Sequence, residues 1–353
     1  MYKKALSVIV IVLLVISVMP VLSFAEDQEG SGSVNGKVTV QATQPQVQFT
    51  LYSDTGYTTS TTEITPQVPV YMKITVSAGN PLEEVTVTTK LFADNNNTQL
   101  GTPPSNTNPE TYVTFTITYN GTNWVLTSDT GGSSTWNIAL DPNQQQPDPS
   151  SNSGSFYVVI TFGKTAREAN NGAGSPYADW DIIVDASIGS ETGEASSYGY
   201  RVYFYSELQP QAGTIDFGSL QPNSEGVIKY VDGNSGDSFN VVVVANGPYD
   251  LKATSTSTWD DGNGHTISLV AATPGQGEFS LKIDDEEDSN NPGTPLNGVY
   301  VTTSVADASP FVDDASPTTE SGVTHTVYML ITLGDNIHTG TYQGVITIHA
   351  VKG

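Results

Sequence analysis

The residues of this sequence that could carry chemistry are mostly carboxylates, and five of them stand side by side: Asp284, Asp285, Glu286, Glu287 and Asp288. Adjacent carboxylates repel one another unless water or a cation offsets their charge. Calcium takes six to eight oxygen ligands from carboxylates, amides and backbone carbonyls on a flexible loop. The run therefore predicts a calcium loop, and a solvated acidic loop is the alternative.

Two further acidic loops have the composition of weaker calcium candidates. Asp232 and Asp237 flank a Gly-Asn-Ser-Gly stretch, and Asp260 and Asp261 precede Gly-Asn. The second loop departs from the EF-hand pattern because His265 occupies the third ligand position. Asp, Asn and Gly also gather in turns for backbone reasons alone. We favour turns for both loops, which leaves calcium as the only candidate cofactor.

Catalytic motifs are missing from the sequence. Its four histidines, His265, His325, His338 and His349, form no H-E-x-x-H or H-x-x-x-H pattern, and no G-x-S-x-G elbow or phosphate-binding loop occurs. The chain has no cysteine, so a thiol nucleophile is excluded. Two carboxylates suffice for a glycosidase, but 37 acidic residues give no reason to choose a pair. We expect no enzymatic activity, with an undetected hydrolase as the least favoured alternative.

The charge and the N-terminal residues indicate where the protein works. A net charge of −25 repels phosphate backbones, which excludes nucleic acid as a partner. Lys3 and Lys4 precede an aliphatic stretch broken by Pro20, and Ser23-Phe24-Ala25 resembles a cleavage site. This layout predicts a signal peptide over residues 1–25, a secreted or cell-surface location and no membrane span in the mature chain. A retained pilin-like leader cut after Lys4 is the alternative.

Alternating residues predict an all-β fold. Val113, Phe115 and Ile117 alternate with threonines, and similar short segments recur along the chain between turn residues. Asn120-Gly121 lies between the predicted strands 111–119 and 124–126 and favours a type I′ turn, in which both central residues have positive φ. Residues 141–155 are expected to be a loop with little reason to be ordered, and residues 303–322 a further long loop. We predict a flexible leader at 26–37 and two Ig-like β-sandwich domains at 38–206 and 207–353.

Aromatic residues could bind sugars if they lay exposed and coplanar. The chain has 17 tyrosines and four tryptophans, Trp124, Trp136, Trp180 and Trp259. Packing within the fold is the favoured interpretation, because large aromatic side chains dominate protein cores. Glycans therefore remain a secondary candidate partner.

Several segments resemble Ig-like domains of microbial surface and pilus-type proteins. Residues 339–350 contain Gly-Thr-Tyr-Gln-Gly followed by an alternating strand, and residues 216–220 and the Val-rich 239–245 with its Asn-Gly-Pro-Tyr end add to the likeness. The resemblance implies surface assembly or adhesion and supplies no catalytic residues. We expect an exported structural or interaction protein, such as a surface-layer, filament or adhesin-like subunit. A carbohydrate-binding or calcium-dependent adhesive module is the alternative.

The leader suggests how self-assembly could occur. Residues 37–42 read as a strand with Val38 and Val40 on one face, and they follow the predicted flexible leader. An extended segment on a flexible tether can add a strand to an open sheet edge of a neighbour. The alternative is that this segment pairs within its own domain.

Overall fold

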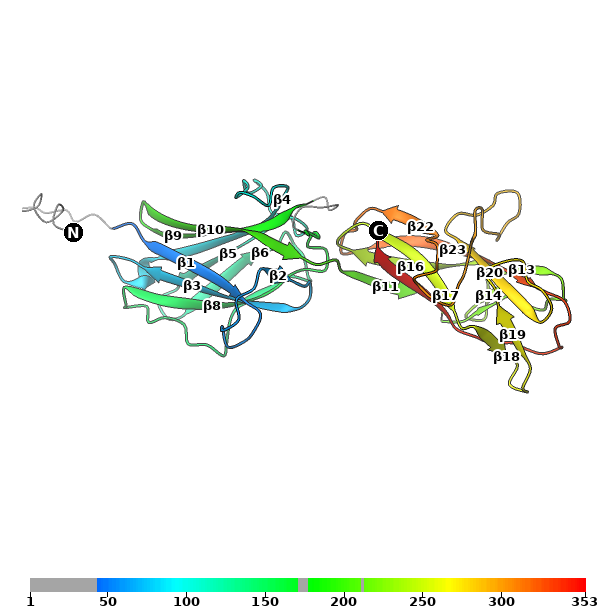
Figure 1. Ribbon diagram of the computed structural model, residues 1–353. Coiled ribbons are helices and arrows are strands. Elements are labelled where there is room, and N and C mark those ends of the chain that lie inside the picture. Colours follow the sequence, from blue (N-terminus) through cyan, green and yellow to red (C-terminus); the bar gives the residue numbers. More distant parts are fainter. Residues whose placement is uncertain (1–42, 171–176, 211–212) are drawn as a thin grey trace, which may run out of the picture. The chain divides into compact units, whose positions relative to one another are not determined.

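The computed structural model describes residues 43–170, 177–210 and 213–353, and regular structure in these ranges is almost entirely β (Figure 1). A single 3-10 turn, η1 (Leu82–Glu84), is the one helical element in them. The predicted all-β fold class is confirmed. The predicted signal peptide, leader and strand at 37–42 lie outside the described residues. In the same ranges, no helix combines the length and apolar character needed to span a bilayer.

Two sheets enclose the first hydrophobic core. One sheet has the order β1-β3-β8-β7, and the other has the order β2-β10-β9-β4-β5-β6. The strands of the first sheet are β1 (Gln46–Tyr52), β3 (Pro69–Ser77), β8 (Ser153–Thr161) and β7 (Asn137–Leu140). Those of the second are β2 (Glu63–Ile64), β10 (Glu191–Val202), β9 (Asp179–Ile188), β4 (Thr86–Asp94), β5 (Tyr112–Tyr119) and β6 (Trp124–Asp129).

Residue alternation explains how these sheets close on each other. In β3 every second side chain, from Val70 to Val76, is buried, and the intervening residues are exposed or half-buried. Neighbouring side chains of a strand point to opposite faces, so the apolar set faces the partner sheet. Burying one such aliphatic side chain stabilises the fold by about 1.5–3 kcal/mol.

Strand β9 differs because both of its faces are covered. Trp180, Ile182 and Val184 belong to the first core, whereas Ile183 belongs to a small separate cluster with Phe92 and Tyr112. The side chains that alternate with the core residues thus point to an outer face that is also sealed. That outer face carries the two buried aspartates described below.

A second core lies between the sheets built from residues after 202. The large sheet has the order β11-β16-β23-β20-β19-β18, with β13 beside β23 and β21 beside β20; a three-stranded sheet has the order β22-β17-β24. The large sheet contains β11 (Ser206–Pro210), β16 (Ser238–Ala245), β23 (Val323–Leu333), β20 (Glu278–Asp284), β19 (Thr266–Leu269), β18 (Thr258–Asp260), β13 (Glu225–Val227) and β21 (Val299–Tyr300). The three-stranded sheet contains β22 (Val312–Ala315), β17 (Tyr249–Ser255) and β24 (Ile346–Lys352). Three short strands form a separate small sheet: β12 (Ile215–Asp216), β14 (Tyr230–Val231) and β15 (Asn234–Ser235).

The two cores share no residue. The first extends from Leu51 to Val202 in the sequence, and the second from Phe217 to Ile331. The predicted boundary between residues 206 and 207 falls in the interval between them. That boundary and the number of Ig-like domains stay predictions, because the contacts of residues 42–353 join them in one compact unit.

The strand ends predicted on either side of Asn120-Gly121 are confirmed, but the predicted type I′ conformation is wrong. Tyr119 pairs with Trp124, so the loop between β5 and β6 has four residues. Gly121 has a positive φ of 89°, but Asn120 is not among the residues with positive φ. Instead the Asn120 side-chain oxygen accepts hydrogen bonds from the backbone N–H groups of Thr122 and Asn123. Asn120 therefore organises the turn through its side chain rather than through an unusual backbone conformation.

The expected loop is confirmed at residues 141–152, although β8 already begins at Ser153, but the expectation that this loop has little reason to be ordered is wrong. Gln146 accepts from the Tyr157 N–H and donates to the Tyr157 carbonyl, each at 3.2 Å. Trp124 donates its indole N–H to the Pro147 carbonyl at 2.8 Å. The Gln146 amide thus serves β8 as a strand would, just beyond the end of β7. Composition could not reveal this order, because its partners lie outside the loop.

The expected loop at 303–322 is likewise partly ordered. It contains β22, and the side chain of Phe311 is buried in the second core. Thr318 is buried and accepts a hydrogen bond from the Ala245 N–H at 2.9 Å. These contacts are made with β16 and β17, so they too depend on residues distant in the sequence.

Gln146 provides a test of the ordered 141–152 segment. Gln146→Ala should lower the free energy of unfolding by about 1–3 kcal/mol, because both backbone groups of Tyr157 lose a partner. Urea denaturation followed by tryptophan fluorescence measures the change.

The matched control is Gln144→Ala, whose side chain makes one long hydrogen bond of 3.5 Å on the exposed surface. It should stay within about 0.5 kcal/mol of the natural protein. Equal effects of the two substitutions would contradict the assignment.

Candidate interaction site

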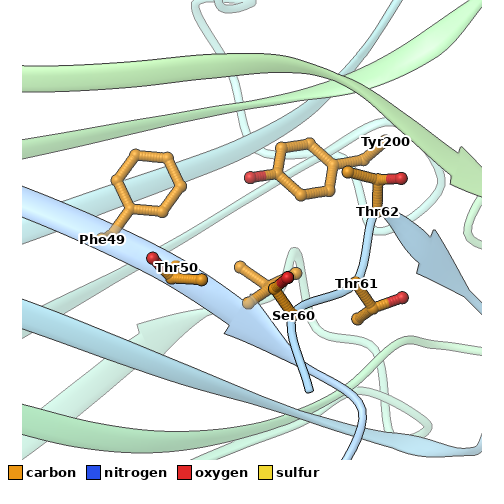
Figure 2. A pocket seen from close by; sticks show the side chains of 7 residues that line it. Phe49, Thr50, Ser60, Thr61, Thr62 and Tyr200 are labelled. Atoms are coloured by element: carbon orange, nitrogen blue, oxygen red, sulfur yellow. The ribbon is translucent and has the colours of Figure 1, made fainter. Parts of the chain in front are cut away.

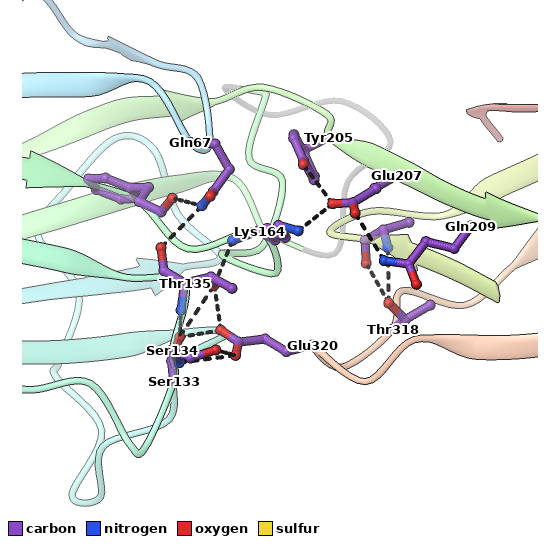
Figure 3. Close-up of polar contacts among 12 residues, drawn as sticks. Gln67, Ser133, Ser134, Thr135, Lys164, Tyr205, Glu207, Gln209, Thr318 and Glu320 are labelled. Carbon is purple, nitrogen blue, oxygen red and sulfur yellow. Dashed lines mark hydrogen bonds and ion pairs between the residues drawn. The ribbon is translucent and has the colours of Figure 1, made fainter.

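Polar side chains join the residues around the first core to those around the second. We call this set the polar junction. Its side chains are those of Ser133, Thr135, Lys164, Arg167, Glu168, Glu207, Asn246, Glu320 and Lys352. Figure 3 shows the contacts of Glu320 and Lys164. Glu320 accepts hydrogen bonds from the hydroxyl groups of Ser133 and Thr135 and from the Ser134 N–H. One carboxylate from the loop before β23 thereby holds the loop before β7.

Ion pairs reinforce the polar junction. Lys164 pairs with Glu207 on β11, and Lys352 on β24 pairs with the buried Glu168. Arg167 pairs with Glu110 and also donates to the Thr318 carbonyl at 3.0 Å. Charge-assisted hydrogen bonds of this kind are shorter and stronger than neutral ones, and Arg can serve two acceptors at fixed angles.

Asn246 lies at the centre of the polar junction. It is fully buried, and its amide nitrogen donates to the carbonyls of Ala166 (2.8 Å) and Tyr203 (2.9 Å). Its amide oxygen accepts from the Tyr205 N–H at 2.8 Å. One side chain thus satisfies three backbone groups from two segments, which fixes the chain path between the cores.

The junction carboxylates are poised to stay ionised. Hydrogen bonding from Lys164 lowers the pKa of Glu207. Burial raises the pKa of Glu320, but hydrogen bonds from Ser133 and Thr135 outweigh it and the net shift is downward. A lowered folded-state pKa gives stability that is present above the usual glutamate value of 4.5 and is lost as the pH falls further. The polar junction is therefore weakest in strong acid.

A second candidate site is a pocket at the sheet edges, which we call the edge pocket (Figure 2). It has a volume of about 420 Å³, and its lining is Phe49, Thr50, Leu51, Ser60, Thr61, Thr62 and Tyr200. Among the named strands of the described ranges β1 pairs only with β3, although Tyr52 at its end forms a single bridge with Ser60. Strand β10 pairs with β2 at only two positions. Hydroxyl and apolar groups without a charged side chain can hold a chain segment or a neutral ligand, but they supply no acid, base or nucleophile activated by a base.

The edges of β1 and β10 meet near the start of β1. Gln44 donates its amide to the Thr192 carbonyl at 2.7 Å. A Cβ atom on Gly193 would lie 1.9 Å from the Pro45 carbonyl oxygen, so only glycine allows this approach.

Aromatic side chains line one smaller pocket. Its volume is about 270 Å³, and Tyr119 and Trp124 form part of the wall together with Asn123, Gln146 and Pro147. The two rings meet edge to face at 60°, so they offer no flat platform. The remaining three tryptophans are buried, as the packing interpretation expected.

The predicted calcium run is held by local hydrogen bonds. Asp284 is buried and accepts from the N–H groups of Asp285 and Asn297. Glu287 accepts from the Gly293 N–H, and Asp288 from that of Asn290, while Asp285 pairs with His325. Glu286 is exposed, and within the described ranges its carboxylate takes part in no hydrogen bond. Within the described ranges, no group of three or more His, Asp or Glu side chains is arranged to hold a metal ion.

Of the weaker calcium candidates, Asp260 and Asp261 serve their own turn. Asp260 accepts from the N–H of Gly262, and Asp261 accepts from that of Asn263. Asp232 instead accepts from the N–H of Thr214, which lies 18 residues earlier in the sequence. Asp237 lies beside Gly293, so the structure brings it to the acidic run. The turn interpretation explains the contacts of Asp260 and Asp261, and calcium binding at the loops stays a prediction.

Two histidines that are far apart in sequence meet in the fold. The rings of His265 and His338 stack at 3.8 Å with an angle of 7°, and Asp261 accepts from His265 at 2.8 Å. Parallel stacked rings cannot both direct a lone pair at one ion, because each lone pair lies in its own ring plane. His325 instead links Tyr249 to Asp285, at 2.8 and 3.1 Å.

Sequence analysis missed a pair of buried carboxylates. Asp179 and Asp181 on β9 are fully buried and lie within hydrogen-bonding reach of each other. They are sealed from solvent, so they cannot meet a substrate as the acid and base of a hydrolase would. An i, i+2 spacing of acids within an apolar strand was the available signal.

Comparisons with known proteins place few constraints on this chain. No protein-family model matches it, and no curated protein does. Among solved structures, it is similar to a chain of a chaperone–tip adhesin complex of CFA/I fimbriae, with 10% identity. That match covers 88% of this chain and 92% of the other, but its TM-score is 0.22, so no argument rests on it.

Asn246 allows a direct test of the polar junction. Asn246→Asp keeps the shape but removes two donors and buries a charge, so it should lower the free energy of unfolding by about 3 kcal/mol or more. Differential scanning calorimetry at pH 7 measures the change.

The matched control is Asn234→Asp, an exposed residue of β15. It should change the free energy of unfolding by no more than about 0.5 kcal/mol. A small effect at Asn246 would mean that the junction does not depend on this side chain.

Proposed function

We propose that this protein is an exported, non-enzymatic structural or interaction subunit of the cell surface, of the surface-layer, filament or adhesin-like kind. The observation that carries the proposal is the polar junction. A subunit that transmits force or holds a fixed spacing needs two β-sandwiches that do not swing freely. Domains within a chain move relative to each other by default unless their interface is extensive.

The composition of the pockets supports the same conclusion. The edge pocket contains no charged side chain, and the carboxylate pair of Asp179 and Asp181 is buried inside the fold. Neither site combines access with an acid, a base or a nucleophile. The proposed role therefore rests on surfaces and stiffness rather than on catalysis.

Self-assembly through strand addition is the mode we favour for this subunit. Residues 37–42 precede β1, and strand addition requires an extended segment on one copy and an open edge on another. In the described ranges β24 pairs only with β17, and its Ile346 and Ile348 are half-buried against the second core. An added strand could cover such side chains and satisfy the free backbone groups of β24.

Negative-stain microscopy of the purified mature protein tests this proposal. We expect ordered filaments or sheets from the natural chain and none from a shortened chain beginning at Pro45. Circular dichroism of the shortened chain shows whether it keeps its β content, so a folding failure is separable from an assembly failure. Assembly by the shortened chain would contradict strand addition, and monomers in every condition would contradict a self-assembling subunit.

A second candidate function is adhesion through glycans, and its candidate site is the pocket of about 270 Å³ beside Tyr119 and Trp124, where two aromatic edges and polar side chains share the wall. Tyr119→Ala should abolish binding on a glycan array if this pocket holds a sugar. The control is Tyr230→Ala, an exposed tyrosine far along the sequence.

Repeating the microscopy and the glycan array with calcium and with EDTA tests the predicted acidic loops. Array binding by monomers would replace the structural role with the adhesive one.

A further inference from the structure

We propose that Asp179 and Asp181, hereafter the aspartate pair, share one proton in the folded protein and that this proton makes the fold more stable in mild acid than at alkaline pH. The inference rests on the placement of the two carboxyl groups and on the charges around them. It is independent of the function proposed above.

The geometry of the aspartate pair leaves two oxygens without a donor. Asp179 Oδ2 accepts from the Gly199 N–H at 2.6 Å, and Asp181 Oδ2 accepts from the Gly101 N–H at 2.5 Å. The Oδ1 atoms of both residues are buried and receive no N–H or O–H group. Two ionised carboxylates can only accept, so a proton on one of them is the simplest way to join them.

The neighbouring strands add negative charge rather than relieve it. Asp94 on β4 is the register partner of Asp179, and its charge disfavours ionisation of both members of the pair. The two nearest cations on adjacent strands point elsewhere: Lys90 pairs with Asp185 at 2.8 Å, and the Arg201 guanidinium lies 4.4 Å from the centre of the Tyr203 ring. Buried like charges without a counter-ion favour protonation of one partner.

Electrostatics agree with this geometry. Burial is the main cause that raises the pKa of Asp181, to about 7, and the charge of Asp179 raises it further. Burial also raises the pKa of Asp179. The usual aspartate value is 3.8, so the folded chain holds a proton that the unfolded chain releases. The resulting stability is complete below that usual value and is lost as the pH rises through about 7.

A cation is the alternative partner for the two free oxygens. Calcium needs six to eight oxygen ligands, and no group of three or more acidic or histidine side chains in the described ranges is arranged to hold a metal. A proton requires only the two oxygens that are present. The experiment below separates the two possibilities.

The test compares the full-length mature protein with Asp181→Asn, Asp179→Asn and the control Glu194→Gln, an exposed residue of β10. Urea unfolding is measured from pH 5 to pH 8 at constant ionic strength. In the natural protein and the control, the unfolding constant should rise about a hundredfold over this range, since two pH units lie below the pKa of about 7. Either Asn variant should remove most of that rise, because an amide replaces the shared proton as donor.

Infrared spectroscopy supplies a readout that does not require the variants to be stable. The natural protein should show the C=O band of a protonated carboxylic acid at pH 5, and the band should disappear by pH 9. Asp181→Asn should lack it. A natural protein without this band, or an Asp181→Asn variant with an unchanged pH slope, would overturn the proposal. Stabilisation of the natural protein but not the variant by calcium at pH 8 would assign a cation instead.

Discussion

The buried amide of Asn246 and the ion pairs around it are the constraint on which the molecule depends as a two-core protein. The apolar residues of each core pack against one another and not against the other core. Hydrophobic burial therefore does not fix the position of one core relative to the other. Hydrogen bonds to Ala166, Tyr203 and Tyr205 supply that constraint, since they tie backbone groups that precede β11 to a side chain that follows β16. Such bonds are directional, whereas hydrophobic contact is not.

Charge has two opposing effects on this fold. The junction glutamates Glu207 and Glu320 have lowered pKa values and favour the folded state above about pH 4.5, the usual glutamate value. The aspartate pair acts in the other direction, because Asp181 has a raised pKa and favours the folded state below about pH 7. Between about pH 4.5 and about pH 7, both the junction glutamates and the aspartate pair stabilise the folded state. An acidic surface also keeps such a protein soluble at high local concentration.

Local signals in the sequence were a good guide to strands and a poor guide to loops and turns. The alternation in 113–119 gave β5, and the tryptophans other than Trp124 are in the cores as packing predicted. The Asn120 turn, the 141–152 segment and the aspartate pair were misjudged or missed. Each depends on which backbone N–H or carbonyl lies beside a side chain in three dimensions. Gln146 donates a hydrogen bond to Tyr157, and Asp181 accepts one from Gly101, although no local sequence pattern connects the two residues of either pair.

The sequence by itself determined the all-β class, because side chains that alternate in a strand must alternate in burial, and it determined the strong negative charge, because charge is a sum over residues. Tertiary structure alone decided where that charge matters. Five adjacent acids in the 284–288 run were conspicuous in the sequence, but most of them accept hydrogen bonds from their own loops or pair with His325. Asp179 and Asp181, which no motif singled out, lie together without a counter-ion. Folding removes the water around them, so the neighbouring groups of the protein determine their protonation.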